Sequence, residues 1–268
     1  MSGDRPARAG ALEPNNIEES VRWQTRNPRR NVQGVPSQED LISTTAWGGA
    51  ILFDLDGTLI DSVYQHVLAW RDALAAEHID LPVWGIHRKV GMSGGLFARA
   101  LLRETGSPVD AAQTERLQRR HEDAFAKYAH GVRPLPGSRD LLLRLRELGV
   151  PWAIATSGRR LRAEACVDLL DVPGREPLVT RDEVRHAKPD PDLFLAAADA
   201  LGVAIGGSIV VGDSIWDLLA AQRARALGVG LLSGGYGREE LERAGAFRVY
   251  EDPADLLDHL DEIGVRDP

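Results

Sequence analysis

The stretch Ala50-Ile51-Leu52-Phe53-Asp54-Leu55-Asp56-Gly57-Thr58 decides the fold. Its apolar run ends at Phe53 and predicts a short strand, which two aspartates follow one residue apart. Because side chains alternate along a strand, Asp54 and Asp56 can point the same way from its carboxyl end, where they repel each other unless a cation lies between them. Mg2+ prefers such oxygen ligands, so the pair indicates a metal site with a carboxylate available as a nucleophile. An acidic turn in solvent, closed by Gly57, is the alternative for this motif alone.

Two further apolar segments end in polar residues. Residues 150–155 lead into Thr156-Ser157-Gly158, whose hydroxyls and backbone N–H groups suit a phosphate. Residues 209–211 lead into Gly212-Asp213, and Asp217 follows at a spacing that places two carboxylates on one face of a helix. Between these segments Lys188 stands among prolines that stiffen the approach to a helix. Together the four segments favour a single metal and phosphate site over an isolated acidic turn.

The second half of the chain alternates between expected strands and helices. This alternation predicts parallel strands joined by right-handed crossovers, with ligands at the carboxyl ends of the strands, where every motif lies. The expected strands are 150–155, 177–179, 209–211 and 229–232, and the expected helices are 138–148, 161–170, 191–201, 216–226 and 253–263.

The segment after the first motif shows only helical patterns. Helices are expected at 62–78, 96–104 and 110–129, and Pro134 marks the return to the core. We therefore expect a helical cap at 64–133, inserted into a catalytic core that comprises 47–63 and 134–268. Residues 1–46 are polar and show little periodicity, so they are expected to form a disordered tail.

Composition excludes several classes of partner. The chain has 268 residues with 32 Lys and Arg against 40 Asp and Glu, a net charge of -8 that disfavours nucleic acid or an anionic membrane as a partner. A single cysteine, Cys166, excludes a disulfide within the chain. Apolar runs stay below the roughly 18 residues of a spanning helix, and the N-terminus shows no signal peptide, so we expect a cytoplasmic protein. The oligomeric state stays open.

The motifs resemble those of the haloacid dehalogenase (HAD) superfamily. The resemblance runs over about residues 48–260 and depends on Asp54-Leu55-Asp56-Gly57-Thr58, Thr156, Lys188 and Gly212-Asp213 with Asp217. It implies an α/β fold in which a Rossmann-like parallel sheet core carries an inserted α-helical cap. The dehalogenating branch lacks the second aspartate of the first motif, so the presence of Asp56 favours phosphoryl transfer.

The resemblance also assigns roles to residues. Asp54 would be the nucleophile that forms a phosphoaspartate, and Asp56 the general acid and base. Mg2+ would be bound by Asp54, the backbone carbonyl of Asp56, Asp213 and Asp217, the last directly or through a water. Thr156 and Lys188 complete the catalytic set. The candidates for phosphate or substrate binding are Thr156, Ser157, Lys188, His66 on the first cap helix and Ser93 in the glycine-rich loop 91–95.

The implied function is that of a Mg2+-dependent phosphatase, a phosphomonoester hydrolase acting on a small phosphorylated metabolite that a cap can enclose. A phosphosugar mutase of the beta-phosphoglucomutase type is the alternative, because His66 and Trp70 fall where that family keeps a histidine and a tryptophan. Residues 89–93, however, lack the arginine with which such mutases hold a second phosphate. A non-catalytic binding or regulatory protein would predict the loss of a motif carboxylate, and all four are present.

Overall fold

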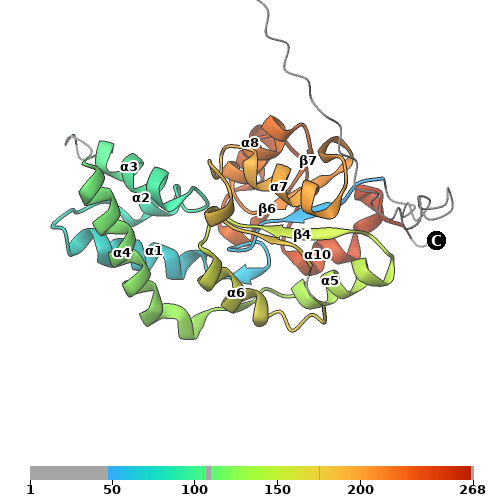
Figure 1. Cartoon of the computed structure of the whole chain (residues 1–268), viewed down its shortest axis with the longest axis horizontal. Helices are drawn as coiled ribbons and strands as arrows, with labels where there is room; N and C mark the ends of the chain where they lie inside the picture. Colours follow the sequence, from blue (N-terminus) through green and yellow to red (C-terminus); the bar gives the residue numbers. More distant parts are fainter. Residues whose placement is uncertain (1–47, 105, 107–109, 175, 267–268) are drawn as a thin grey trace, which may run out of the picture. The chain divides into compact units, whose positions relative to one another are not determined.

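A six-stranded parallel sheet organises the chain (Figure 1). The computed structural model describes residues 48–104, 106, 110–174 and 176–266, so the predicted tail at 1–46 lies outside the described residues. The strand order is β5-β4-β1-β6-β7-β8, and each neighbouring pair is parallel. The α/β class with a Rossmann-like core is thus confirmed. The strands are β1 (Ile51–Phe53), β4 (Trp152–Ala155), β5 (Leu178–Val179), β6 (Ile209–Gly212), β7 (Leu227–Leu231) and β8 (Ala246–Tyr250).

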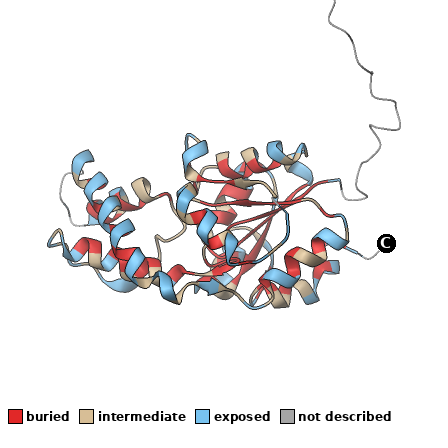
Figure 2. Ribbon diagram, turned by 60° about the horizontal axis from the view of Figure 1, so that its bottom comes forward, coloured by how far each residue is buried: buried red, intermediate tan, exposed pale blue. Residues whose placement is uncertain are grey.

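Helices cover both faces of this sheet, which explains why its central strands are apolar throughout. Ile51 and Phe53 point to one face and share a hydrophobic cluster, whereas Leu52 points to the other face and belongs to a second cluster. Figure 2 shows buried strands between helices that are exposed on their outer sides. The first face packs against α5 (Ser138–Glu147), α6 (Arg160–Asp168) and α10 (Pro253–Asp258), and the second against α7 (Asp192–Leu201) and α8 (Ile215–Ala224).

Four helices are inserted between two short strands. The strands β2 (Ile60–Asp61) and β3 (Arg133–Pro134) pair antiparallel, so the chain leaves and re-enters the sheet domain at one place. The helical segment α1–α4 between them has its own hydrophobic cluster, which includes Trp70, Phe97 and Leu117. Its helices are α1 (Val63–Ala75), α2 (Val83–His87), α3 (Gly94–Glu104) and α4 (Ala111–Tyr128). The exact division into core and cap at residues 63/64 and 133/134 stays a prediction.

Five elements were not expected from the sequence: the helices α2 and α9 (Arg238–Arg243), the strand β8 and the two-residue strands β2 and β3. Both helices are too short to show a periodic pattern. The strand β8 lies at the sheet edge, where Phe247 and Arg248 are exposed, so it has no continuous apolar run. Short 3-10 turns complete the fold at Ala129–Gly131, Arg181–Glu183, Ile205–Gly207, Leu232–Gly234 and Leu260–Ile263. Within the described ranges, no helix combines the length and the apolarity needed to cross a bilayer.

Candidate active site

Three buried carboxylates meet where β1 and β6 end. Asp54 follows β1 directly, Asp213 follows β6, and Asp217 lies in the first turn of α8. Each offers an oxygen within 4.8 Å of the others. Burial is the main cause that raises the pKa of Asp54, to about 7, and the charges of Asp217 and Asp56 add to it. Burial, together with repulsion from the charges of Asp217 and Asp54, raises the pKa of Asp213 well above its usual value. This cluster therefore carries more negative charge than its surroundings accommodate.

Lys188 supplies one counter-charge to the cluster. Its side chain is completely buried, its ammonium group bonds to Asp54, and its Nζ lies 2.9 Å from Asp217 Oδ1. Burial alone would lower the pKa of Lys188, but the carboxylates of Asp217 and Asp54 outweigh it and raise the pKa above its usual value. Lys188 is thus a permanent cation between two of the three carboxylates.

Two glycines allow the loops to approach Asp213. Gly57 has a φ of +87°, and a Cβ there would lie 2.5 Å from Asp213 Oδ2. A Cβ on Gly234, in the loop after β7, would lie 1.8 Å from the same oxygen. Thr58, next to Gly57, donates a hydrogen bond of 3.0 Å to Asp213 Oδ1. Gly234 therefore lies against the carboxylate cluster.

The carboxylate of Asp56 lies apart from this cluster. The chain turns at once after β1, since the carbonyl of Leu55 accepts hydrogen bonds from Thr58, Leu59 and Ile60, so strand alternation does not extend to Asp56. The expectation that the Asp54 and Asp56 carboxylates flank one cation is therefore wrong. Only the backbone carbonyl of Asp56 remains a candidate metal ligand.

Asp56 instead belongs to a second polar group. Its Oδ1 accepts hydrogen bonds from Ser62 Oγ at 2.7 Å and His66 Nε2 at 3.2 Å, and its Oδ2 lies 3.9 Å from Arg162 Nη2. Burial opposes ionisation of Asp56, but the contacts with His66, Arg162 and Ser62 outweigh it and hold its pKa below the usual range. Asp56 and Asp54 thus have different protonation behaviour although one residue separates them, which is typical of carboxylates with different catalytic tasks.

His66 is held in place by a second histidine. Its Nδ1 lies 3.0 Å from Nε2 of His121, a residue of α4, and its ring stacks on Phe125 at a centroid distance of 4.3 Å. His121 in turn stacks on Trp70 at 4.2 Å. Burial is the main cause that lowers the pKa of both histidines. The sequence predicted that His66 lies close to the substrate, whereas nothing in it indicated His121.

Two phosphate-binding candidates, Thr156 and Ser157, follow β4, which lies on the opposite side of β1 from β6. Thr156 follows β4, and its Oγ1 accepts a hydrogen bond of 2.9 Å from the amide of Gly158, so its own O–H group can donate to a phosphate. Ser157 Oγ instead donates to the carbonyl of Gly91 at 3.1 Å. The glycine-rich loop 91–95 therefore contacts the catalytic core.

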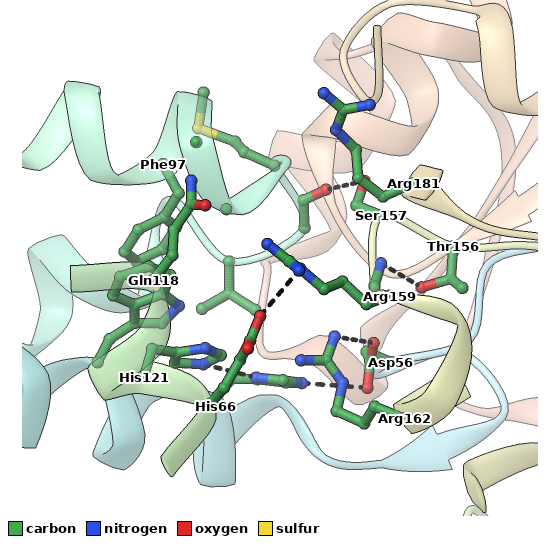
Figure 3. A pocket seen from close by; sticks show the side chains of 18 of the residues that line it. Asp56, His66, Phe97, Gln118, His121, Thr156, Ser157, Arg159, Arg162 and Arg181 are labelled. Atoms are coloured by element: carbon green, nitrogen blue, oxygen red, sulfur yellow. Dashed lines mark hydrogen bonds and ion pairs between the residues drawn. The ribbon is translucent and has the colours of Figure 1, made fainter. Parts of the chain in front are cut away.

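One cavity of about 390 Å³ joins these groups. Figure 3 shows Asp56, His66 and Arg162 on one side of it and Thr156 and Ser157 on another. Asp54, Thr156 and Ser157 line it, as does His66, whereas Ser93 is buried and does not. The other polar residues of its wall were not predicted, although the run Arg159-Arg160-Leu161-Arg162 directly after Thr156-Ser157-Gly158 indicates positive charge at this site. They are Gln118, His121, Glu122, Arg159, Arg162, Arg181 and Asp182.

The carboxylate cluster fits Mg2+. All side-chain donors of Asp54, Asp213 and Asp217 are carboxylate oxygens, which a hard divalent cation prefers, and their oxygens are close enough to share one ion. Among the described residues, this is the one group of three or more potential ligand residues whose ligand atoms all lie within 4.8 Å of one another. Hydrogen bonds from Ser214 to Asp217 Oδ2, 3.1 Å from the amide and 2.5 Å from the hydroxyl, leave Oδ1 directed at Lys188 and the cluster.

Comparisons with known proteins agree with this geometry. The family model described as haloacid dehalogenase-like hydrolase matches residues 49–225. A phosphoglycolate phosphatase of Caulobacter vibrioides is 34% identical over 206 residues, 74% of this chain and 85% of that protein. A beta-phosphoglucomutase of Mycobacterium bovis is 32% identical over 238 residues, 78% of this chain and 91% of that protein. The crystal structure of a hydrolase from Pseudomonas syringae has 54% identity and a TM-score of 0.78, and covers 80% of this chain and 99% of its own.

Proposed function

The chain belongs to the haloacid dehalogenase-like hydrolase family, and we propose that it hydrolyses phosphate monoesters of a small metabolite through a phosphoaspartate on Asp54. It is an enzyme of the phosphatase type, as the curated relatives with this name indicate. Phosphoglycolate, which gives some of these relatives their name, is a first candidate substrate. The cytoplasmic location expected from the sequence stays a prediction.

The main support for this proposal is that Asp54 and Asp56 have different surroundings. Asp54 lies beside Lys188 in the carboxylate cluster, while Asp56 faces the cavity with hydrogen bonds to Ser62 and His66. A phosphatase that works in two steps needs one carboxylate to bond to phosphorus and another to move protons. The position of Asp54 and Asp56 on the wall of one cavity supports the assignment of these two tasks to them.

In the first step, an oxygen of Asp54 attacks phosphorus and the bond from phosphorus to the ester oxygen breaks. The Thr156 hydroxyl and Lys188 hold the phosphate oxygens and offset the developing charge; loss of one such preorganised donor typically costs about 3–4 kcal/mol in the transition state. Asp56 gives its proton to the departing alcohol. The negative charge of a bound phosphate favours protonation of Asp56, which counters the low pKa of this residue in the free protein.

In the second step, Asp56 takes a proton from a water molecule, and the resulting hydroxide attacks the phosphoaspartate. Inorganic phosphate leaves and the Asp54 carboxylate is restored. Asp54, Asp213, Asp217 and the carbonyl of Asp56 would hold Mg2+, which supplies charge neutralisation and polarisation of the phosphoryl oxygens when bound. The helical segment α1–α4 would act as the cap that excludes bulk water.

A mutase remains the second candidate. In the sequence, a mutase is supported by the positions of His66 and Trp70, and both residues line the cavity. The cap loop at 89–93 has no arginine, but Arg159 and Arg162 reach the cavity from the core, so a second phosphate would not lack a cationic partner. A mutase also shares 32% identity with this chain.

Phosphate release from a panel of phosphorylated metabolites, with Mg2+ and with chelator, tests the proposed function. We expect Mg2+-dependent phosphate release from at least one small ester and from p-nitrophenyl phosphate. The Asp54→Asn and Asp56→Asn variants should be inactive while retaining the circular dichroism spectrum of the parent. Absence of release from every ester in Mg2+ would refute the phosphatase assignment.

A further inference from the structure

We propose that the substrate carries a second anionic group close to its phosphate ester, and that Arg159 and Arg162 bind this group. The inference rests on the proposed function, because it specifies what is attached to the phosphate. It narrows the substrates from any small phosphate ester to phosphorylated acids and bisphosphates. Both classes present planar or tetrahedral oxyanions that a guanidinium can bind through two parallel hydrogen bonds.

Arg162 lies on the cavity wall near the proposed proton donor. Its guanidinium Nη2 lies 3.9 Å from Asp56 Oδ2, beyond hydrogen-bond distance, and it lies 5.3 Å above the ring of Phe125. Arg162 is only 24% exposed and lines the cavity (Figure 3). Asp56 is the residue proposed to protonate the ester oxygen, so the carbon atoms attached to that oxygen must lie near Arg162. A charged group one or two bonds further along is within its reach.

Arg159 adds a second cation to the same wall. It lies three residues before Arg162, at the start of α6, and its Nε pairs with Glu122 of α4 at 2.9 Å. Both partners of this pair are substantially exposed, 61% and 43%, so water screens it and a substrate anion can compete for the guanidinium. Glu122 and Arg159 come from the helical segment and the core, respectively, so the anion would bind where the two meet.

Besides Asp56 and Glu122, two carboxylates of the described residues line the cavity, and both are bound by other groups. Asp54 is paired with Lys188, and Asp182 accepts a hydrogen bond from the amide of Arg160. A third cation, Arg181, also lines the cavity, and its guanidinium donates to the carbonyl of Val184. This carbonyl is neutral, so the charge of Arg181 adds to the field in the cavity. A neutral leaving group would leave Arg159 and Arg162 with only the solvent-screened Glu122 and the more distant Asp56 as anionic partners.

Matched substrate pairs test the inference. The first pair is 2-phosphoglycolate and 2-hydroxyethyl phosphate, which differ in one carboxylate. The second is fructose 1,6-bisphosphate and fructose 6-phosphate, which differ in one phosphate. For each pair, the ratio of the two kcat/KM values for release of the first phosphate measures the contribution of the second anionic group alone. Folding, Mg2+ binding and the chemical step are common to both members and cancel in the ratio. p-Nitrophenyl phosphate reports whether the enzyme is a phosphatase at all.

We expect the wild type to prefer the doubly anionic member of at least one pair by about tenfold or more, the range for hydrogen bonds to a charged group. Arg162→Gln and Arg159→Gln should each lower that ratio toward one. Arg119→Gln is the matched control: Arg119 lies on the outer side of α4, contacts Glu115 at 3.8 Å and does not line the cavity, so the ratio should stay at the wild-type value.

The pair that shows the preference identifies the anion as a carboxylate or a phosphate. Hydrolysis of p-nitrophenyl phosphate with ratios near one in both pairs would overturn the inference while the phosphatase assignment stands. A strong preference that survives in both arginine variants would also overturn it, because other residues would then bind the anion. If no ester in the set releases phosphate in Mg2+, the proposed function itself fails.

Discussion

Replacement of Lys188 by methionine should both destabilise the fold and stop catalysis. The Lys188 side chain is completely buried and contacts Asp54 and Asp217. Methionine fills a similar volume but leaves the carboxylates without their fixed cation. Removal of one partner from a buried ion pair costs about 3–5 kcal/mol. For a domain of this size, about 2–4 °C is lost per kcal/mol, so the melting temperature in chelator should fall by about 6–20 °C.

The response to Mg2+ separates electrostatics from packing. A divalent cation can replace part of the missing charge, so Mg2+ should raise the melting temperature of Lys188→Met more than that of the wild type. Adding Asp54→Asn to Lys188→Met should recover part of the lost stability, because it removes one uncompensated carboxylate. Lys127→Met, the same substitution at an exposed position of α4, should change neither property.

Differential scanning calorimetry in EDTA and in Mg2+, together with phosphate release, measures these effects. A Lys188→Met protein with the melting temperature, Mg2+ response and activity of the wild type would refute the assigned role of Lys188. Loss of stability without a larger Mg2+ response, or without recovery by Asp54→Asn, would show that Lys188 acts through packing and not through its charge.

Four further predictions concern the reaction. Asp54→Asn should abolish turnover but keep or slightly raise stability in chelator, because burial raises the pKa of Asp54 to about 7 and the folded state thus disfavours its charge; calorimetry and a phosphate assay check both parts. EDTA should silence the enzyme, Mg2+ should restore it and Ca2+, with its looser shell, should do so poorly, whereas full activity in excess chelator would contradict the roles of Asp213 and Asp217. Phosphorus NMR with sugar 1- and 6-phosphates and a trace of sugar bisphosphate as primer should show free phosphate as the main product, whereas isomerisation that needs the primer and is faster than phosphate release would establish a mutase. His66→Ala should lower kcat by about 10²-fold, because displacement of a catalytic group such as Asp56 by about one ångström has an effect of that size.

The parallel sheet was predictable because each central strand is buried on both faces. Such strands must be continuously apolar, and the motifs must follow them at one edge. The same reasoning placed Asp54, Thr156, Lys188 and Asp213 around one point, where the structure indeed brings them together. It could not find β8, because an edge strand with Phe247 and Arg248 exposed has no such constraint.

The surroundings of the leaving group were much less predictable. His121 and Glu122 come from the middle of α4, where the sequence shows only an ordinary amphipathic helix. Their approach to Asp56 and Arg159 depends on how α4 packs against α1 and on where β2 and β3 return the chain to the core. Neither is encoded in a local pattern. The direction of the Asp56 carboxylate was predicted wrongly for a related reason: strand alternation was extended to Asp56, three residues beyond the end of β1.

The two histidines show how the helical segment contributes to the acid and base. Burial lowers the pKa of His66 and of His121, so both rings are neutral at neutral pH. A neutral His66 that donates through Nε2 to Asp56 must accept at Nδ1, and we therefore assign the proton on Nε2 of His121 as the donor. This assigns one tautomer to each ring and directs one lone pair of Asp56 Oδ1 toward His66. Because His121 belongs to α4, the orientation of Asp56 depends on the helical segment as well as on the motif around Asp54. The first motif alone therefore supplies the nucleophile, whereas an oriented proton donor requires α1 and α4 to pack together beside it.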